Sequence, residues 1–260
     1  MPQSTFIYFC INLCVLYFVL NAFMVCYLLG DFMIGVIVAE LQEMEAIKLL
    51  MKNISLETKF NLNLYIGTIQ NTQVLLVRSG VGKVNAARVC QLITDNYNLD
   101  LIINLGSAGA LNDNLKIGDI VIGQKLVQHD FDVTAFGRSK GFIPESGLFF
   151  ESDKDLIKRC NNIKIDNINV VHGIIGSADI FVTDTLQKQS IINEFNCDCV
   201  EMEGASIAQV CFLNKIPFLV FRSISDTPNG KNNIDFNEYL KLASKNCATF
   251  ILELIKALEG

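Results

Sequence analysis

The chain has 260 residues, 51% of them apolar, with only four prolines and a formal net charge of −6. This length and apolar content are enough for one hydrophobic core, and they exclude a disordered chain, which would be rich in charge and poor in large apolar side chains. The 21 basic residues are scattered among 27 acidic ones. Nucleic-acid binding depends on clustered Lys and Arg, so we expect no nucleic-acid partner.

Residues 6–29 form an almost continuously apolar run near the start of the chain. As a helix this run would span about 36 Å, which is enough to cross a bilayer core of about 30 Å. The first basic residue of the chain is Lys48, and no small-residue cleavage site follows the run, so the pattern of a signal peptide is incomplete. Two interpretations of residues 1–32 therefore stay open: a membrane anchor or export signal, or upstream sequence translated ahead of a true start at Met33.

Nine cysteines are present. Three of them, Cys10, Cys14 and Cys26, lie in the apolar leader, and only Cys197 and Cys199 are close neighbours. A single CxC pair with no second Cys or His cluster nearby is a poor zinc site, and this pair falls in a segment with the pattern of a buried strand. We therefore expect free structural thiols and no metal.

From Met33 onward, strand-like segments alternate with segments that have helical spacing of apolar residues. Strands are expected at residues 33–39, 62–70, 73–78, 101–105, 119–127, 169–175, 197–200 and 218–224. Helices are expected at residues 40–52, 84–97, 153–160, 204–214 and 235–258. The sequence therefore predicts one α/β domain over residues 33–260, with three layers and a central mixed β-sheet flanked by helices.

Two glycine-rich segments follow predicted strands. Gly80-Val81-Gly82-Lys83 could present backbone N–H groups to a phosphate. However, Asn85 stands where a dinucleotide fingerprint needs its third glycine, and Val84 stands where a P-loop needs Ser or Thr. A tight turn from strand to helix is the favoured interpretation. The second segment, Gly106-Ser107-Ala108-Gly109, suits close approach of the backbone to a ligand at the mouth of the sheet.

Three acidic residues, Glu43, Glu203 and Asp226, follow separate predicted strands. Carboxylates at strand ends meet in space, and three of them could share the cleavage of a glycosidic bond. One would prepare water, one would hold the ribose as positive charge develops on it, and one would protonate the leaving group. By residue type alone, each of the three would more often be a solvated surface carboxylate or a helix cap than a catalytic group.

Six motifs occur in order along residues 33–260, and both their order and their separations form a pattern. They are Ser79-Gly80-Val81-Gly82-Lys83-Val84, Ile103-Asn104-Leu105-Gly106-Ser107-Ala108-Gly109, Gly118-Asp119-Ile120-Val121, His129-Asp130-Phe131-Asp132-Val133-Thr134-Ala135-Phe136-Gly137, Val200-Glu201-Met202-Glu203 and Arg222-Ser223-Ile224-Ser225-Asp226. This arrangement resembles the 5′-methylthioadenosine/S-adenosylhomocysteine nucleosidases, whose fold is nucleoside phosphorylase-like.

The resemblance implies a role for each of the three carboxylates. Glu43 matches the family's catalytic carboxylate, which activates water for attack at the anomeric carbon. Glu203 matches the residue that hydrogen-bonds the ribose hydroxyls, with Met202 beside the sugar. Asp226 matches the group that engages purine N7 and assists its protonation. An Asp of ordinary pKa, near 3.9, would be ionised at neutral pH, so we expect burial to raise the pKa of Asp226.

Further contacts are implied by the same resemblance, with plain core packing as the alternative for each. Positions expected to contact the nucleoside are Ser107, Ala108, Gly109, Phe181, Val182, Arg222 and Ser225. Positions expected to line the pocket for the 5′-alkylthio group are Val81, Val133, Phe136, Pro144 and Phe236, some of them lent across a dimer interface.

The activity implied is phosphate-independent hydrolysis of 5′-methylthioadenosine and S-adenosylhomocysteine, and also of 5′-deoxyadenosine, with release of adenine. The ligand is then a small adenine nucleoside, the assembly a homodimer, and no cofactor is expected. The catalytic domain is expected in the cytoplasm, with membrane association through residues 6–29 if the leader is an anchor.

Three other functions stay open. A nucleoside phosphorylase would need cations for phosphate, whereas Asn104 fills the place where that branch typically has an arginine. An aminofutalosine hydrolase would use similar residues. A membrane-tethered binding or adhesion protein without activity would not require the three carboxylates. Two departures from the family pattern, Glu40 and Arg138, bring charge near the 5′ pocket and bear on substrate preference.

Overall fold

The structure is a computed structural model that describes residues 32–226 and 236–260. Within these ranges no helix is both long and apolar enough to cross a bilayer. Residues 33–260 make one compact unit. The apolar leader and its three cysteines lie outside the described residues, so both interpretations of residues 1–32 stay predictions.

Strands and helices alternate along the chain. The strands are β1 (Met33–Val38), β2 (Lys52–Lys59), β3 (Leu62–Ile69), β4 (Thr72–Arg78), β5 (Leu101–Ala110), β6 (Ile120–Gln128), β7 (Phe150–Glu151), β8 (Val170–Ser177), β9 (Cys199–Glu201) and β10 (Phe218–Asp226). The helices are α2 (Leu41–Lys48), α3 (Lys83–Asn96), the short 3₁₀ helix η1 (Thr134–Phe136), α4 (Lys154–Cys160), α5 (Thr185–Phe195), α6 (Gly204–Asn214) and α7 (Phe236–Glu259).

The strands form one mixed sheet that partly closes on itself. β5 pairs with β10, β10 with β6, β6 with β8, β8 with β9, and β9 again with β5, so these five strands make a ring. β1, β4, β3 and β2 continue the sheet outward from β5. β1, β5 and β10 are parallel neighbours, and their carboxyl ends therefore meet at one edge of the sheet.

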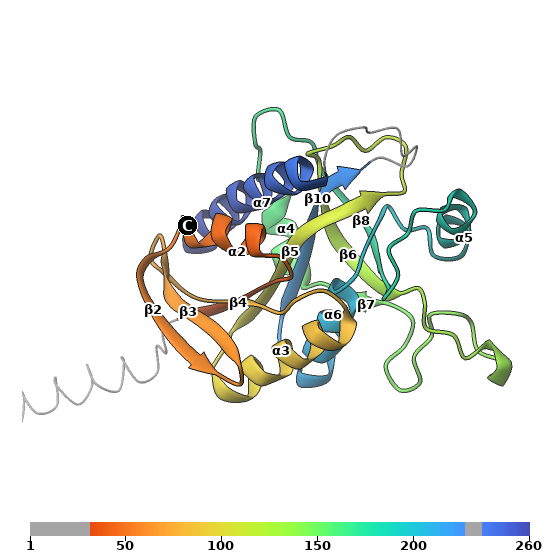
Figure 1. Cartoon of the computed structure of the whole chain (residues 1–260), viewed down its shortest axis with the longest axis horizontal. Helices are drawn as coiled ribbons and strands as arrows, with labels where there is room; N and C mark the ends of the chain where they lie inside the picture. The colour runs from red at the N-terminus through yellow and green to blue at the C-terminus, as the bar shows by residue number, and fades with distance from the viewer. Residues whose placement is uncertain (1–31, 227–235) are drawn as a thin grey trace, which may run out of the picture. The chain divides into compact units, whose positions relative to one another are not determined.

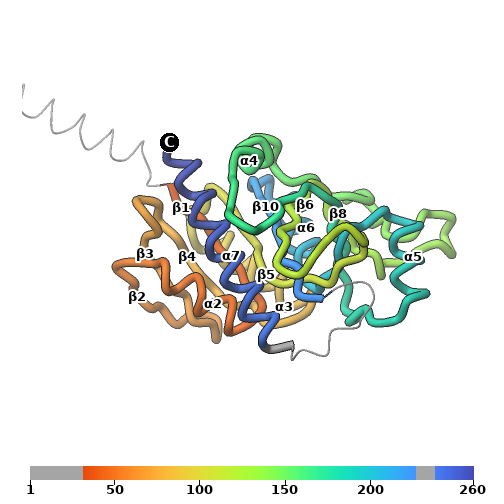
Figure 2. The backbone as a smooth tube through the Cα atoms, turned by 90° about the horizontal axis from the view of Figure 1, so that it is seen from above, coloured from red at the N-terminus to blue at the C-terminus, as the bar shows by residue number. Residues whose placement is uncertain are grey.

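Helices cover both faces of the sheet, which confirms the predicted three-layer α/β fold (Figure 1). α2 and α7 contact each other on one face, and α3 and α6 contact each other on the opposite face. Figure 2 shows α7 running across its face beside α2. The residues of β5 alternate between the two cores: Ile103 and Leu105 pack with the α2 and α7 side, and Ile102 packs with the α3 and α6 side. This alternation is the two-residue period of a strand buried on both faces.

Several elements differ from the sequence-based expectation: β5 runs on to Ala110, and the short β7 and η1 were not predicted. The first helix ends at Lys48, and Lys52–Lys59 forms β2, a largely exposed edge strand whose two apolar residues, Ile54 and Leu56, are both exposed. Helix α5 was not predicted either, because its only buried apolar side chains are Ile191 and Phe195. A usable signal for α5 was Asp184, whose side chain accepts a hydrogen bond from the backbone N–H of Leu186 as an N-cap.

The six cysteines in the described ranges are free and buried. Burial raises the pKa of Cys197 to about 12, and the nearby Asp198 charge adds to this shift. Cys199 is fully buried in β9, and burial also raises the pKa of its thiol. Both thiols are therefore protonated at neutral pH, which agrees with a structural role for this CxC pair.

Candidate active site

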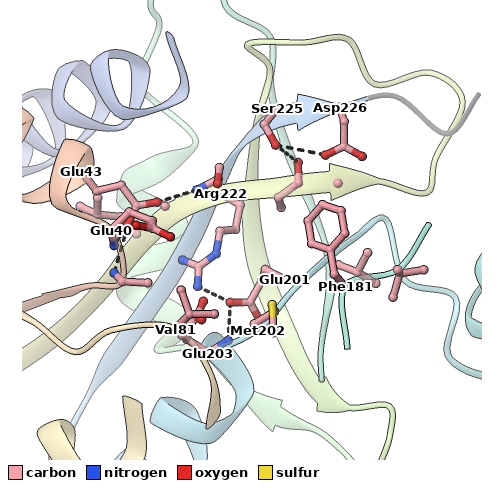
Figure 3. A pocket seen from close by; sticks show the side chains of 18 of the residues that line it. Glu40, Glu43, Val81, Phe181, Glu201, Met202, Glu203, Arg222, Ser225 and Asp226 are labelled. Atoms are coloured by element: carbon pink, nitrogen blue, oxygen red, sulfur yellow. Dashed lines mark hydrogen bonds and ion pairs between the residues drawn. The ribbon is translucent and has the colours of Figure 1, made fainter. Parts of the chain in front are cut away.

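A cavity of about 310 Å³ opens where the ends of β1, β5 and β10 meet (Figure 3). Its volume suits a small organic ligand. The described residues that line it are Ala39, Glu40, Glu43, Val81, Leu105, Gly106, Ser107, Ala108, Gly109, Ile180, Phe181, Val182, Val200, Glu201, Met202, Glu203, Arg222, Ser225 and Asp226.

Three different elements bring the predicted carboxylates into this cavity. Glu43 lies in the first turn of α2, directly after β1. Asp226 is the last residue of β10. Glu203 is the N-cap of α6, two residues after β9. The expected convergence is therefore seen, although only Asp226 belongs to a strand and the other two depend on where a helix begins.

Glu43 is almost completely buried and accepts three backbone hydrogen bonds. Its Oε2 accepts from the N–H of Ala39 at 3.0 Å and of Glu40 at 2.9 Å, and its Oε1 accepts from the N–H of Ser107 at 3.1 Å. Burial raises the pKa of Glu43, and the hydrogen bonds and the Arg222 charge oppose that rise only in part. Such a carboxylate is poised to take a proton from water nearer neutral pH than an exposed Glu could.

Gly106 allows Glu43 to reach this position. A Cβ atom at residue 106 would lie 2.6 Å from Oε1 of Glu43. At Gly109 a Cβ atom would lie 3.0 Å from Oδ2 of Asp226. From the sequence, this glycine segment was expected to follow the strand and to allow the close approach of a ligand, whereas residues 106–109 belong to β5 itself. In the structure its two glycines make room for two of the carboxylates.

Asp226 lies across the cavity from Glu43 (Figure 3). Its Oδ1 accepts a hydrogen bond from the hydroxyl of Ser225 at 3.1 Å. Burial raises the pKa of Asp226, while the Ser225 hydrogen bond and the Lys188 charge lower it by smaller amounts. The direction is the one that the chemistry of a proton donor requires.

A buried ion pair between Glu201 and Arg222 was not assigned from the sequence. Arg222 is 1% exposed and its guanidinium contacts Glu201 and the side-chain oxygen of Asn104. Glu201 also accepts hydrogen bonds from the Ser177 hydroxyl and the Glu203 backbone N–H. Burial raises the pKa of Glu201, but the Arg222 charge and these hydrogen bonds outweigh it, so the pKa is lowered overall. The signal was present in the Val200-to-Glu203 motif, where an acid ends a buried strand.

Glu203 accepts a hydrogen bond from the backbone N–H of Gly82 at 2.8 Å. Burial and the neighbouring Glu201 charge raise the pKa of Glu203 to about 8. This raised pKa favours the protonated form of the Glu203 side chain, which can donate a hydrogen bond. The Gly80-to-Lys83 segment is the favoured tight turn, and its amides face protein carboxylates: Lys83 N–H donates to Asp179 at 2.8 Å.

The raised pKa of Glu203 predicts how stability changes with pH. An unfolded Glu ionises near 4.5, whereas folded Glu203 ionises near 8, so the folded state holds a proton that the unfolded state loses between these values. The stabilisation of the folded state by protonated Glu203 is complete below pH 4.5 and is lost as pH rises toward 8. The melting temperature of the ligand-free protein should therefore fall over this range, and Glu203→Gln should flatten the fall. Thermal unfolding at several pH values measures this, with exposed Glu238→Gln as the control. An equally steep profile in Glu203→Gln would contradict the assignment.

Most of the remaining predicted contacts line the cavity. They are Ser107, Ala108, Gly109, Val81, Phe181, Val182, Met202, Arg222 and Ser225. Val133, Phe136 and Pro144 do not line it, and Phe136 is 84% exposed. Their contribution across a dimer interface stays a prediction. The side chain of Phe236 lies outside the described residues.

The two departures from the family pattern are placed differently. Glu40 lines the cavity beside Glu43. Arg138 is exposed, and its guanidinium lies 5.3 Å from the ring centre of Phe142. Within residues 32–226 and 236–260, no group of three or more His, Cys, Asp or Glu side chains could hold a metal ion.

Comparison with known proteins identifies the family. A model of the phosphorylase superfamily matches residues 33–256. The 5′-methylthioadenosine/S-adenosylhomocysteine nucleosidase of Staphylococcus haemolyticus is 40% identical over 226 residues, which cover 86% of this chain and 99% of that protein. The solved structure of the S. pneumoniae nucleosidase with the transition-state inhibitor MT-ImmA is 36% identical, with a TM-score of 0.83 over 87% of this chain and 100% of that chain. Futalosine hydrolase of Helicobacter pylori is 30% identical, with a TM-score of 0.82 over 87% of this chain and 98% of that one. The chain belongs to the 5′-methylthioadenosine/S-adenosylhomocysteine nucleosidases of the phosphorylase superfamily.

Proposed function

We propose that the chain hydrolyses the N-glycosidic bond of 5′-methylthioadenosine and S-adenosylhomocysteine, and also of 5′-deoxyadenosine, without phosphate. Similarity to 5′-methylthioadenosine/S-adenosylhomocysteine nucleosidases supports the first two substrates, and the cavity supports the chemistry. The observation that carries the proposal is the set of three carboxyl groups with raised pKa values in one cavity: Glu43, Glu203 and Asp226.

Each carboxyl group has a separate part in the proposed reaction. Glu43 takes a proton from the water that attacks the anomeric carbon, and Glu203 holds the ribose hydroxyls. Asp226 gives a proton to purine N7, so that adenine leaves as a neutral base while the C–N bonding electrons pass to the ring. Adenine would stack on Phe181, which lies on the same side of the cavity as Asp226 (Figure 3). Positioned acid and base groups typically contribute about 10²- to 10⁴-fold each in rate.

The charge of the cavity favours water over phosphate as the nucleophile. Among the described lining residues Arg222 is the single cation, and it is already paired with Glu201. Asn104, which stands where the phosphorylase branch typically has an arginine, is buried and bonded to the Ile37 carbonyl and to Arg222. A phosphate dianion would meet acidic neighbours without a free cation, and like charges in a site of low dielectric repel strongly.

The discriminating experiment measures adenine release from 5′-methylthioadenosine in buffer without phosphate. We expect sustained turnover, and added phosphate should change the initial rate by less than about twofold. A rate that depends on phosphate, or a 5′-substituted ribose 1-phosphate among the products, would identify a phosphorylase instead. Aminofutalosine is a second substrate to compare because of the similarity to futalosine hydrolase, and a higher kcat/KM on it would favour that activity.

A homodimer is also proposed, with the partner copy completing the 5′ end of the cavity. Apolar side chains at the cavity are unusually exposed for such groups: Val81 is 43% and Phe181 is 63% exposed. Burial of such a patch against a second copy would stabilise both the dimer and the site. Analytical ultracentrifugation of residues 33–260 tests this, since a monomer at assay concentration would contradict it. Cell fractionation tests the location of the protein. We expect residues 33–260 alone in the cytoplasmic fraction, and recovery of the full chain with membranes would support association through residues 6–29.

A further inference from the structure

Three charged residues outside the cavity make a closed set of contacts, which we call the clamp: Lys83, Asp130 and Asp179. The Lys83 ammonium lies 2.6 Å from Oδ1 of Asp130. The backbone N–H of Lys83 donates to Oδ1 of Asp179 at 2.8 Å, and the backbone N–H of Asp179 donates to Oδ2 of Asp130 at 3.1 Å. These residues come from three separate places: the first residue of α3, the turn after β6 and the loop after β8.

The neighbours of the clamp in the chain are residues of the site itself. Gly82, directly before Lys83, donates its N–H to the carboxylate of Glu203. Phe181 and Val182, which closely follow Asp179, line the cavity. None of the three clamp residues lines it. The clamp therefore joins the segment that holds the ribose-binding carboxylate to the segment that carries the adenine-stacking ring.

The ion pair between Lys83 and Asp130 is partly shielded from water, whereas Asp179 and its two hydrogen bonds are exposed. The Lys83 and Asp130 side chains are 15% and 17% exposed, so their attraction is screened less than that of a surface pair. The Lys83 ammonium also donates to Gln128 at 3.2 Å, and Gln128 donates to Gln209 of α6 at 2.7 Å. Since Glu203 is the N-cap of α6, the clamp is tied to Glu203 by a second route.

The local backbone also fits this arrangement. Gly82 has a φ of +100°, and a Cβ atom there would lie 3.1 Å from Oδ1 of Asp179. A side chain at residue 82 would therefore be strained and would press on the clamp. The segment is built so that the start of α3 and the loop after β8 come together closely.

We infer that Lys83, Asp130 and Asp179 are positioning residues. They hold the segment of Phe181 and Val182, which we call the adenine wall, at a set distance from Glu203, which binds the ribose. The inference rests on the proposed nucleosidase function. A bound nucleoside reaches from the adenine wall to Glu203, and its scissile bond lies between them. Small misplacement of groups away from the chemistry can cost as much as about 10²-fold in rate, because reacting atoms must be held in near-attack geometry. Adenine alone contacts only the adenine wall, so its binding does not depend on the distance from that wall to Glu203.

The central test compares Asp179→Ala with Asp179→Asn. Asn keeps a side-chain oxygen that can accept the Lys83 N–H, whereas Ala removes it. We expect Asp179→Ala to lower kcat/KM for 5′-methylthioadenosine at least about tenfold, mostly through kcat, and Asp179→Asn to stay within about threefold of the parent. The Kd of adenine should change less than about threefold in both variants. Asp155→Ala, which removes an exposed ion pair with Lys158, is the matched control and should leave activity unchanged.

A double-mutant cycle separates positioning from a merely structural role. If the clamp places the adenine wall, the losses from Asp179→Ala and Phe181→Ala should be less than additive, because a misplaced ring has less to lose. Additive losses, an Asp179→Ala variant within about threefold of the parent, or adenine binding that falls as far as turnover would each overturn the inference. Failure of the proposed function is distinguishable, since the parent itself would then release no adenine.

Discussion

Replacing Asp226 with Asn is expected to lower kcat for 5′-methylthioadenosine by about 10² to 10⁴-fold. Asn keeps the size of the side chain and can still bond with the Ser225 hydroxyl, which lies 3.1 Å from Oδ1 of Asp226. It cannot transfer a proton to purine N7, so adenine would have to leave with a negative charge. Nucleoside binding should change far less than kcat, because the cavity keeps its shape. Steady-state assays of adenine release measure kcat. Calorimetry with a non-hydrolysable analogue measures the Kd of the nucleoside.

The Ser225 hydroxyl provides a finer control on this assignment. Its hydrogen bond lowers the pKa of Asp226, against the larger raising effect of burial. Ser225→Ala should therefore raise the pKa further. An acid acts only while protonated, so the alkaline limb of the kcat profile should move to higher pH in Ser225→Ala. An Asp226→Asn variant within about threefold of the parent rate would show that another group protonates the base.

Replacing Glu43 with Gln is expected to reduce kcat by a similar factor, about 10² to 10⁴-fold, because an amide cannot take a proton from water. The parent kcat/KM should rise with pH through the raised pKa of Glu43, since a base acts only when ionised. That ascending limb should disappear in Glu43→Gln. The measurement is the pH profile of residual activity in both proteins.

Stability must be measured beside activity for this variant. Both oxygens of Glu43 accept backbone N–H groups, and Gln would point an N–H₂ group at one of them. Leaving a buried donor unpaired costs about 1–3 kcal/mol, so a lower melting temperature is expected. If kcat stays within about threefold of the parent in folded Glu43→Gln, Glu43 is not the base. Gly106→Ala offers an independent check, because its Cβ atom would lie 2.6 Å from Oε1 and would displace the intact carboxylate.

Most elements were predictable because their residues carry a local pattern. The apolar residues of β10 and α6 have the spacing of a buried strand and of a helix, and both elements have clear ends. The expected and observed ranges therefore agree closely. β2 was missed because it is an exposed edge strand with no buried face, and Ile54 and Leu56 are its only apolar residues. The closure of five strands into a ring could not be predicted, since it depends on pairing between strands far apart in the sequence, such as β5 with β9.

The sequence by itself determined the fold class, the family and the residue types available for chemistry, because periodicity and ordered motifs are local properties of the chain. Only the tertiary structure decided how those residues are charged and held. Burial raises the pKa values of Glu43 and Asp226, and the pairing of Arg222 with Glu201 removes the cation that an anion would need. Both effects arise from desolvation and from contacts between distant segments, which exist only after the chain has folded.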